Sequence, residues 1–195
     1  MDAANRAQVS WRWVVIVLST GAAVLIIVAI TLWPRGPTLH DFGDAPDPTY
    51  PSLLASNSAR HAEITWAWFG DNVDAEADAR VPNADSFDDG LVSYSPITFE
   101  VTDNNWADNL YVNILADLNN DGNWDEPNEW VVQNRVVNVP PGQSQVFTTD
   151  NSLPPHTWIR MTLTGESLSN YVGRGAFQIG ETEDHLTMME NAVYK

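Results

Sequence analysis

The chain has 195 residues, with 26 Asp and Glu against 9 Lys and Arg, a formal net charge of −17, and no cysteine. Because affinity for nucleic-acid phosphates needs clustered Lys and Arg, this balance excludes a nucleic-acid partner. Without cysteine, disulfides, a thiolate nucleophile and a zinc–thiolate site are also excluded. We therefore expect a hard cation such as Ca²⁺, which prefers oxygen ligands, to stabilise an exported domain of this composition.

Residues 14–33 form an uncharged, apolar run. At 1.5 Å per residue, a helix of this length spans about 30 Å, the thickness of a bilayer's hydrocarbon core. Arg6 and Arg12 precede the run, and an acidic stretch follows Arg35. The positive-inside rule therefore predicts a single-pass cell-membrane anchor with residues 1–13 as a short cytoplasmic tail and the C-terminal domain outside the cell. A cleaved signal peptide is the competing interpretation.

Residues 34–51 contain five prolines, which is typical of an extended stalk and entry segment. Residues 52–195 are expected to form one domain. At its start, the pattern over Leu53–His61 suggests a short helix, and residues 71–90 suggest a long, irregular acidic loop that needs a function or an ion to hold it.

The rest of the domain is rich in short stretches that alternate apolar and polar residues. Examples are Ile97–Val101, Leu110–Ile114 and Ile159–Leu163, and turn sequences such as Asn120-Asp121-Gly122 separate them. Alternation places one side of each stretch in a core. We therefore predict an all-β fold, an antiparallel β-sandwich preceded by one N-terminal transmembrane helix.

The sharpest local motif is D-x-N-x-D-G, the first half of an EF-hand-type calcium loop, at Asp117–Gly122. Alternate residues of such a loop aim oxygens at the ion, and the glycine permits the sharp bend. The twelfth position is Asn128, with the glutamate one residue later, and strands rather than helices are expected on both sides. The candidate Ca²⁺ ligands are Asp117, Asn119, Asp121, the Asn123 carbonyl, Asp125 and Glu129. A plain solvated turn is the alternative.

A second acidic group is Glu181, Glu183 and Asp184 in the sequence GETED. These carboxylates are additional candidate metal ligands. The alternative is an exposed acidic turn before the last strand, because like charges this dense are costly to bury unpaired.

Tryptophans suggest another role, because Trp66 and Trp68 point the same way if TWAWF is a strand. They form a candidate ligand platform for glycans. The four histidines lack zinc-site spacing and no serine lies in G-x-S-x-G, so we do not expect an enzyme. A hydrolase using paired carboxylates is a second alternative.

Several motifs together resemble one family. They are DFGDAPDPTYP (41–51), ARH (59–61), VDAEAD (73–78), LADLNNDGNWDEPNEW (115–130), TWIRMTLT (157–164) and GETED (180–184). Their order is similar to that of bacterial GEVED-domain proteins over about residues 41–190. Thr182 stands at the usual valine, and His185 where tyrosine is common. The resemblance implies an extracellular β-sandwich module of secreted or surface-bound proteins, and it favours a metal-binding role for the acidic motifs.

The sequence as a whole predicts a membrane-anchored, cell-surface structural or adhesive β-sandwich stabilised by Ca²⁺. Its expected partners are the membrane and, beyond it, other cell-surface proteins, further copies of the chain or glycans. A calcium-dependent, lectin-like carbohydrate-binding module is the first alternative.

Overall fold

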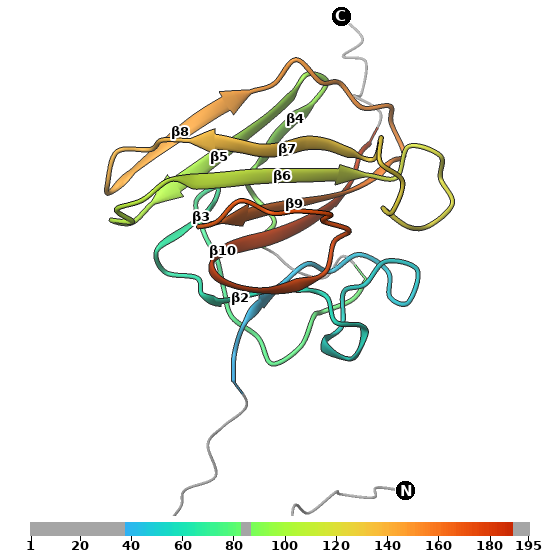
Figure 1. Ribbon diagram of the computed structural model, residues 1–195, viewed down its shortest axis with the longest axis horizontal. Helices are drawn as coiled ribbons and strands as arrows, with labels where there is room; N and C mark the ends of the chain where they lie inside the picture. Colours follow the sequence, from blue (N-terminus) through green and yellow to red (C-terminus); the bar gives the residue numbers. More distant parts are fainter. Residues whose placement is uncertain (1–37, 83–86, 189–195) are drawn as a thin grey trace, which may run out of the picture. The chain divides into compact units, whose positions relative to one another are not determined.

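The structure is a computed structural model that describes residues 38–82 and 87–188. The predicted transmembrane segment, residues 14–33, lies outside these residues. Within the described part of the chain, no helix is long and apolar enough to cross a bilayer. The described residues form an all-β fold in two sheets, which confirms the predicted fold class at that level (Figure 1).

The larger sheet has six strands in the order β1-β2-β10-β9-β6-β7. Their bounds are Asp41–Phe42 (β1), Ala59–Glu63 (β2), Leu110–Ala116 (β6), Trp130–Val137 (β7), Trp158–Thr164 (β9) and Gly175–Leu186 (β10). All neighbours pair antiparallel except β2 and β10, which run parallel.

In the smaller sheet, β5 is the central strand and pairs antiparallel with β3, β4 and β8. The bounds are Ala67–Phe69 (β3), Leu91–Tyr94 (β4), Ile97–Asp103 (β5) and Gln143–Thr148 (β8). No α-helix occurs among the described residues, and residues 71–82 and 87–90 contain no strand, as the loop prediction requires.

The main core lies between the sheets and follows from alternation. In β5, Ile97, Phe99 and Val101 are fully buried while the residues between them are half-buried. They share one apolar cluster with Ile114 of β6 and Met161 of β9. In β5, period-two patterning therefore predicted both the strand and the face that it buries. In β6 and β9 it predicted the strands, but most residues on both faces of these strands are buried.

A second apolar cluster covers the other face of the larger sheet. It contains Tyr50, Leu115, Trp124 and Tyr171, and the Tyr50 and Trp124 rings stack with centroids 4.5 Å apart. Because Tyr50 is buried and β1 pairs with β2, the described part of the expected stalk, residues 38–51, belongs to the domain. The domain therefore begins before residue 52.

The short helix expected over Leu53–His61 is wrong. A 3₁₀ turn spans only Leu54–Ser56, and it ends where Asn57 adopts a left-handed conformation with φ of 54°. β2 follows at Ala59 and pairs on one edge with β1 and on the other with β10. These two neighbours outweigh the weak local helical preference, because strand pairing satisfies the backbone on both edges.

Candidate functional site

The loop that joins β6 to β7, residues 117–129, contains the predicted calcium motif. Its two ends are held together, because the Ala116 N–H donates to the Glu129 carbonyl over 2.8 Å. At the same end, the Asp117 N–H donates to the Trp158 carbonyl of β9 over 3.0 Å. The side chains of Asp117 and Glu129 are both buried, at 2% and 0% exposure. The sheet therefore brings the first and last candidate ligands to one place.

Inside the loop, alternate side-chain oxygens accept hydrogen bonds from the loop's own backbone. The bonds run from the N–H of Asp121 to Asp117 Oδ1 (3.1 Å), Gly122 to Asp117 Oδ2 (3.0 Å), Asp121 to Asn119 Oδ1 (2.9 Å), Asn123 to Asp121 Oδ1 (3.2 Å) and Asp125 to Asn123 Oδ1 (2.9 Å). Gly122 has φ of +88°, a conformation that favours glycine. The loop is thus a series of turns stabilised by its acidic and amide side chains.

Tyr50, which belongs to the second apolar cluster, contacts this loop and is affected by its charges. Its hydroxyl donates to Asp117 Oδ2 over 2.5 Å. Burial raises the Tyr50 pKa, and the hydrogen bond to Asp117 and the charges of Asp117, Asp121 and Glu129 raise it further. These three carboxylates therefore act on one hydroxyl, and the phenol stays protonated as the donor.

Glu129 and Glu126 form a buried pair of carboxyls in the loop. Oε1 of Glu129 accepts the Leu118 N–H over 3.0 Å, whereas Oε2 of Glu129 and Oε2 of Glu126 are buried and no N–H of the described residues donates to them. Burial raises the pKa of Glu129 to about 7, and a side-chain hydrogen bond with Glu126 and the charge of Glu126 also raise it. Two adjacent buried carboxylates need a shared proton or a cation. Two side chains alone supply fewer ligands than the six to eight oxygens that Ca²⁺ takes.

Glu126 was not among the residues predicted from the sequence. Glu126 is an acidic residue directly after the ninth position of the motif, so the sequence offered it as a ligand. It was left out because EF-hand spacing places the next ligand at the twelfth position. Across residues 38–82 and 87–188, no three His, Asp or Glu side chains form a group that could hold a metal ion. The Ca²⁺ site therefore stays a prediction. Its predicted ligands include the neutral oxygens of Asn119 and Asn123.

The GETED carboxylates lie within β10, not in a turn before the last strand, and all are buried, so the exposed-turn alternative is wrong. Glu181 and Glu183 pair opposite Leu163 and Met161, on the face toward the smaller sheet, whereas Asp184 pairs opposite Arg160 on the other face. Burial raises the pKa of Glu181 well above its usual value, and the charges of Glu183 and Asp41 raise it further.

Each GETED acid binds a different, distant segment. Glu181 Oε2 accepts the Phe69 N–H of β3 over 2.5 Å, and Glu183 Oε1 accepts the Gly90 N–H before β4 over 2.8 Å. Asp184 accepts two bonds from Arg160 and one from the Ala45 N–H. Gly180 is also required, because a Cβ there would lie 1.8 Å from the Leu163 carbonyl oxygen. These contacts connect the two sheets and the entry segment.

The predicted tryptophan platform is only partly accessible. Trp68 is half-buried in β3, while Trp66 just before the strand is 37% exposed and its Nε1 donates to Glu63 over 3.0 Å. The Trp66 ring meets the Trp106 ring edge to face, with centroids 6.3 Å apart. Sequence spacing did not identify Trp106, because it comes from the connection between β5 and β6.

The family model described as GEVED domain matches residues 111–187, a stretch that runs from β6 through β10 and contains both the 117–129 loop and the GETED sequence. No curated protein and no solved structure matches the chain.

Proposed function

With residues 111–187 identified as a GEVED domain, we propose that the chain is a membrane-anchored, cell-surface structural or adhesive β-sandwich module stabilised by calcium. The ion would bind in the loop between β6 and β7. The residues that would hold it are Asp117, Asn119, Asp121, the Asn123 carbonyl, Asp125 and Glu129, with Glu126 added because of its position. The anchor would be residues 14–33.

The observation that carries this proposal is the buried pair of carboxyls on Glu126 and Glu129. Two carboxylates this close repel each other and are costly to bury unless they share a proton or bind a cation. Calcium neutralises such carboxylates and takes six to eight oxygen ligands. The charges of Asp117, Asp121 and Glu129 all act on the Tyr50 hydroxyl.

The chain's own contacts explain how an ordered loop would stabilise the domain. Tyr50 connects the loop to the entry segment through Asp117, and its ring stacks on Trp124 within the loop. Trp124 in turn lies 4.7 Å from the buried Arg160 guanidinium. An ion that fixed residues 117–129 would therefore favour the packing of the second apolar cluster, which is the role we propose for it.

Linkage sets the expected size of the effect. A ligand at 100 times its Kd that binds only the folded state adds about 2.7 kcal/mol to the free energy of unfolding. For a domain of this size each kcal/mol raises Tm by about 2–4 °C, so saturating Ca²⁺ should raise Tm by roughly 5–10 °C.

The test is thermal unfolding of the full chain in detergent, followed by circular dichroism in millimolar Ca²⁺, millimolar Mg²⁺ or chelator. Glu129→Gln removes the buried charge, and Asp150→Asn is the matched control because Asp150 is exposed and outside the loop. We expect Ca²⁺ to raise the Tm of the wild type and of Asp150→Asn, and Glu129→Gln to lose most of that rise. Equal wild-type Tm values in Ca²⁺ and chelator would refute the calcium proposal.

A further inference from the structure

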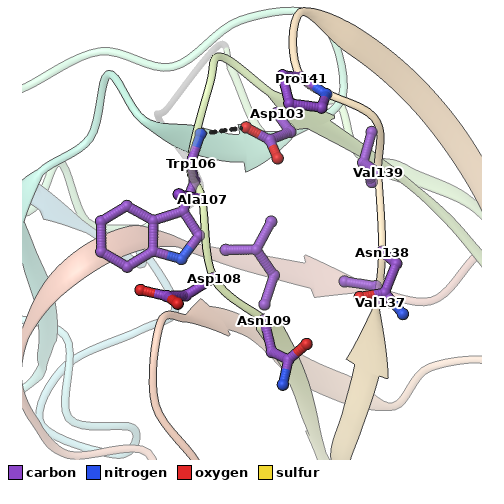
Figure 2. A pocket seen from close by; sticks show the side chains of 10 residues that line it. Asp103, Trp106, Ala107, Asp108, Asn109, Val137, Asn138, Val139 and Pro141 are labelled. Carbon is purple, nitrogen blue, oxygen red and sulfur yellow. Dashed lines mark hydrogen bonds between the residues drawn. The ribbon is translucent and has the colours of Figure 1, made fainter.

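A pocket of about 330 Å³ opens at the other end of β6, between the β5–β6 and β7–β8 connections (Figure 2). Trp106, Asp108 and Asn109 come from the first connection, and Asn138 comes from the second. The apolar side chains of Leu110 and Val137 line it as well. Figure 2 shows the residues of the β5–β6 connection facing those of the β7–β8 connection across the opening.

Hydrogen bonds from backbone N–H groups hold both walls in place. Asp103 at the end of β5 accepts the Trp106 N–H on its Oδ1 and the Gly142 N–H on its carbonyl, both over 2.6 Å. The Asn104 N–H donates to the Trp66 carbonyl over 2.8 Å, which ties the same connection to the start of β3. The pocket is therefore formed before any ligand binds, which lowers the entropic penalty of binding.

The pocket combines an aromatic side chain with short polar groups. Trp106 is half-buried, and its buried Nε1 has no hydrogen-bond partner among the described residues. Asp108, Asn109 and Asn138 are exposed, so their carboxylate and amide groups are free to meet a ligand. Among the described residues that line the pocket none is Lys, Arg or His, while Asp103 and Asp108 are acidic. An anionic ligand would therefore be repelled.

From this arrangement we propose that the pocket binds a neutral saccharide. Vicinal hydroxyls of a sugar donate to a carboxylate such as that of Asp108 and both donate to and accept from amides such as Asn109 and Asn138. The apolar C–H face of the ring suits the half-buried indole of Trp106. The volume lies at the small end of ligand pockets, which fits a mono- or disaccharide unit.

This site is separate from the proposed calcium loop. The pocket lies at the Leu110 end of β6 and the loop follows Ala116, so seven strand residues, about 20 Å, separate them. Saccharide binding should therefore be independent of Ca²⁺, unlike the calcium-dependent lectin predicted from Trp66 and Trp68. Failure of one proposal leaves the other standing, because Tm in chelator tests calcium and saccharide binding in chelator tests the pocket.

The experiment is saturation-transfer NMR on the full chain in detergent. The probes are glucose, galactose and N-acetylglucosamine, with N-acetylneuraminic acid as the anionic comparison. Asp108→Ala and Asn138→Ala each remove a polar group from the pocket, and Asp150→Ala is the control at an exposed aspartate elsewhere.

We expect at least one neutral sugar to bind equally in Ca²⁺ and chelator, with affinity at least tenfold weaker in Asp108→Ala and in Asn138→Ala, and unchanged in Asp150→Ala. The proposal is overturned if no neutral probe binds, if both pocket variants bind as the wild type does, or if N-acetylneuraminic acid binds as tightly as the neutral sugars. If one pocket variant fails to fold, the other decides.

Discussion

Replacing Asp184 with asparagine should remove the carboxylate that forms a salt bridge with Arg160. Both side chains are fully buried. Arg160 uses all of its N–H donors, and its bonds run from Nε to Asp184 Oδ1 (2.8 Å), from Nη2 to Asp184 Oδ2 (2.6 Å) and Ser52 Oγ (2.9 Å), and from Nη1 to the carbonyls of Pro51 (2.6 Å) and Gly173 (2.7 Å). The guanidinium is thus a junction between β9, the entry segment and the chain before β10.

The magnitude follows from this burial. Asparagine keeps the size of the side chain but leaves a buried cation beside a neutral amide, and breaking a buried pair in this way costs about 3–5 kcal/mol. That is a large part of the roughly 5–15 kcal/mol that stabilises a domain. Arg160→Met should be similarly harmful, because Asp184 would then be the uncompensated charge.

The assay is urea unfolding of the full chain in detergent and chelator, so that calcium does not contribute. Arg160→Met/Asp184→Asn removes both charges and should be less destabilised than the sum of the single variants by about 2 kcal/mol. Asp150→Asn, at an exposed site, should stay within about 0.5 kcal/mol of the wild type. A loss below about 1 kcal/mol for Asp184→Asn, or strict additivity in the double variant, would refute the reasoning.

Three further outcomes are expected. His61 is fully buried between the Ile179 carbonyl and the Thr182 hydroxyl, and burial lowers its pKa from 6.5 to about 3. Below pH 6.5 the unfolded chain takes up a proton on His61 that the folded chain does not, so acidification to pH 5 should lower the free energy of unfolding by about 2 kcal/mol through this group. Urea unfolding at several pH values should show a smaller loss of this free energy in His61→Gln than in the wild type. Identical pH dependence in the two proteins would contradict this. Phe99→Ala removes a ring that packs against Phe69 and Phe147 in the core between the sheets. In the same assay it should lower the free energy of unfolding by about 3–5 kcal/mol. A loss under 1 kcal/mol would show that the core tolerates the cavity. Deleting residues 14–33 should move the chain from the membrane to the soluble fraction in cell fractionation; a deletion variant that stays with the membrane would contradict the predicted anchor.

Local patterns were enough for the parts of the fold whose information lies within a few residues. Alternation in β5, β6 and β9 predicted strands because successive side chains of a strand point to opposite faces. The turns of the 117–129 loop were likewise readable, because Asp and Asn side chains bond backbone groups two residues ahead.

The sequence by itself therefore determined that the domain is built of strands, which face of β5 is buried, and where an acidic loop interrupts the strands. Only the tertiary structure decided what the GETED acids do, because their partners at Phe69, Gly90 and Arg160 lie far away along the chain. The close spacing of the GETED carboxylates along the chain favoured an exposed turn, because no local pattern shows which distant N–H groups donate to them. The pocket at Trp106 also required the fold, because the pairing of β6 with β7 is what brings its two connections together.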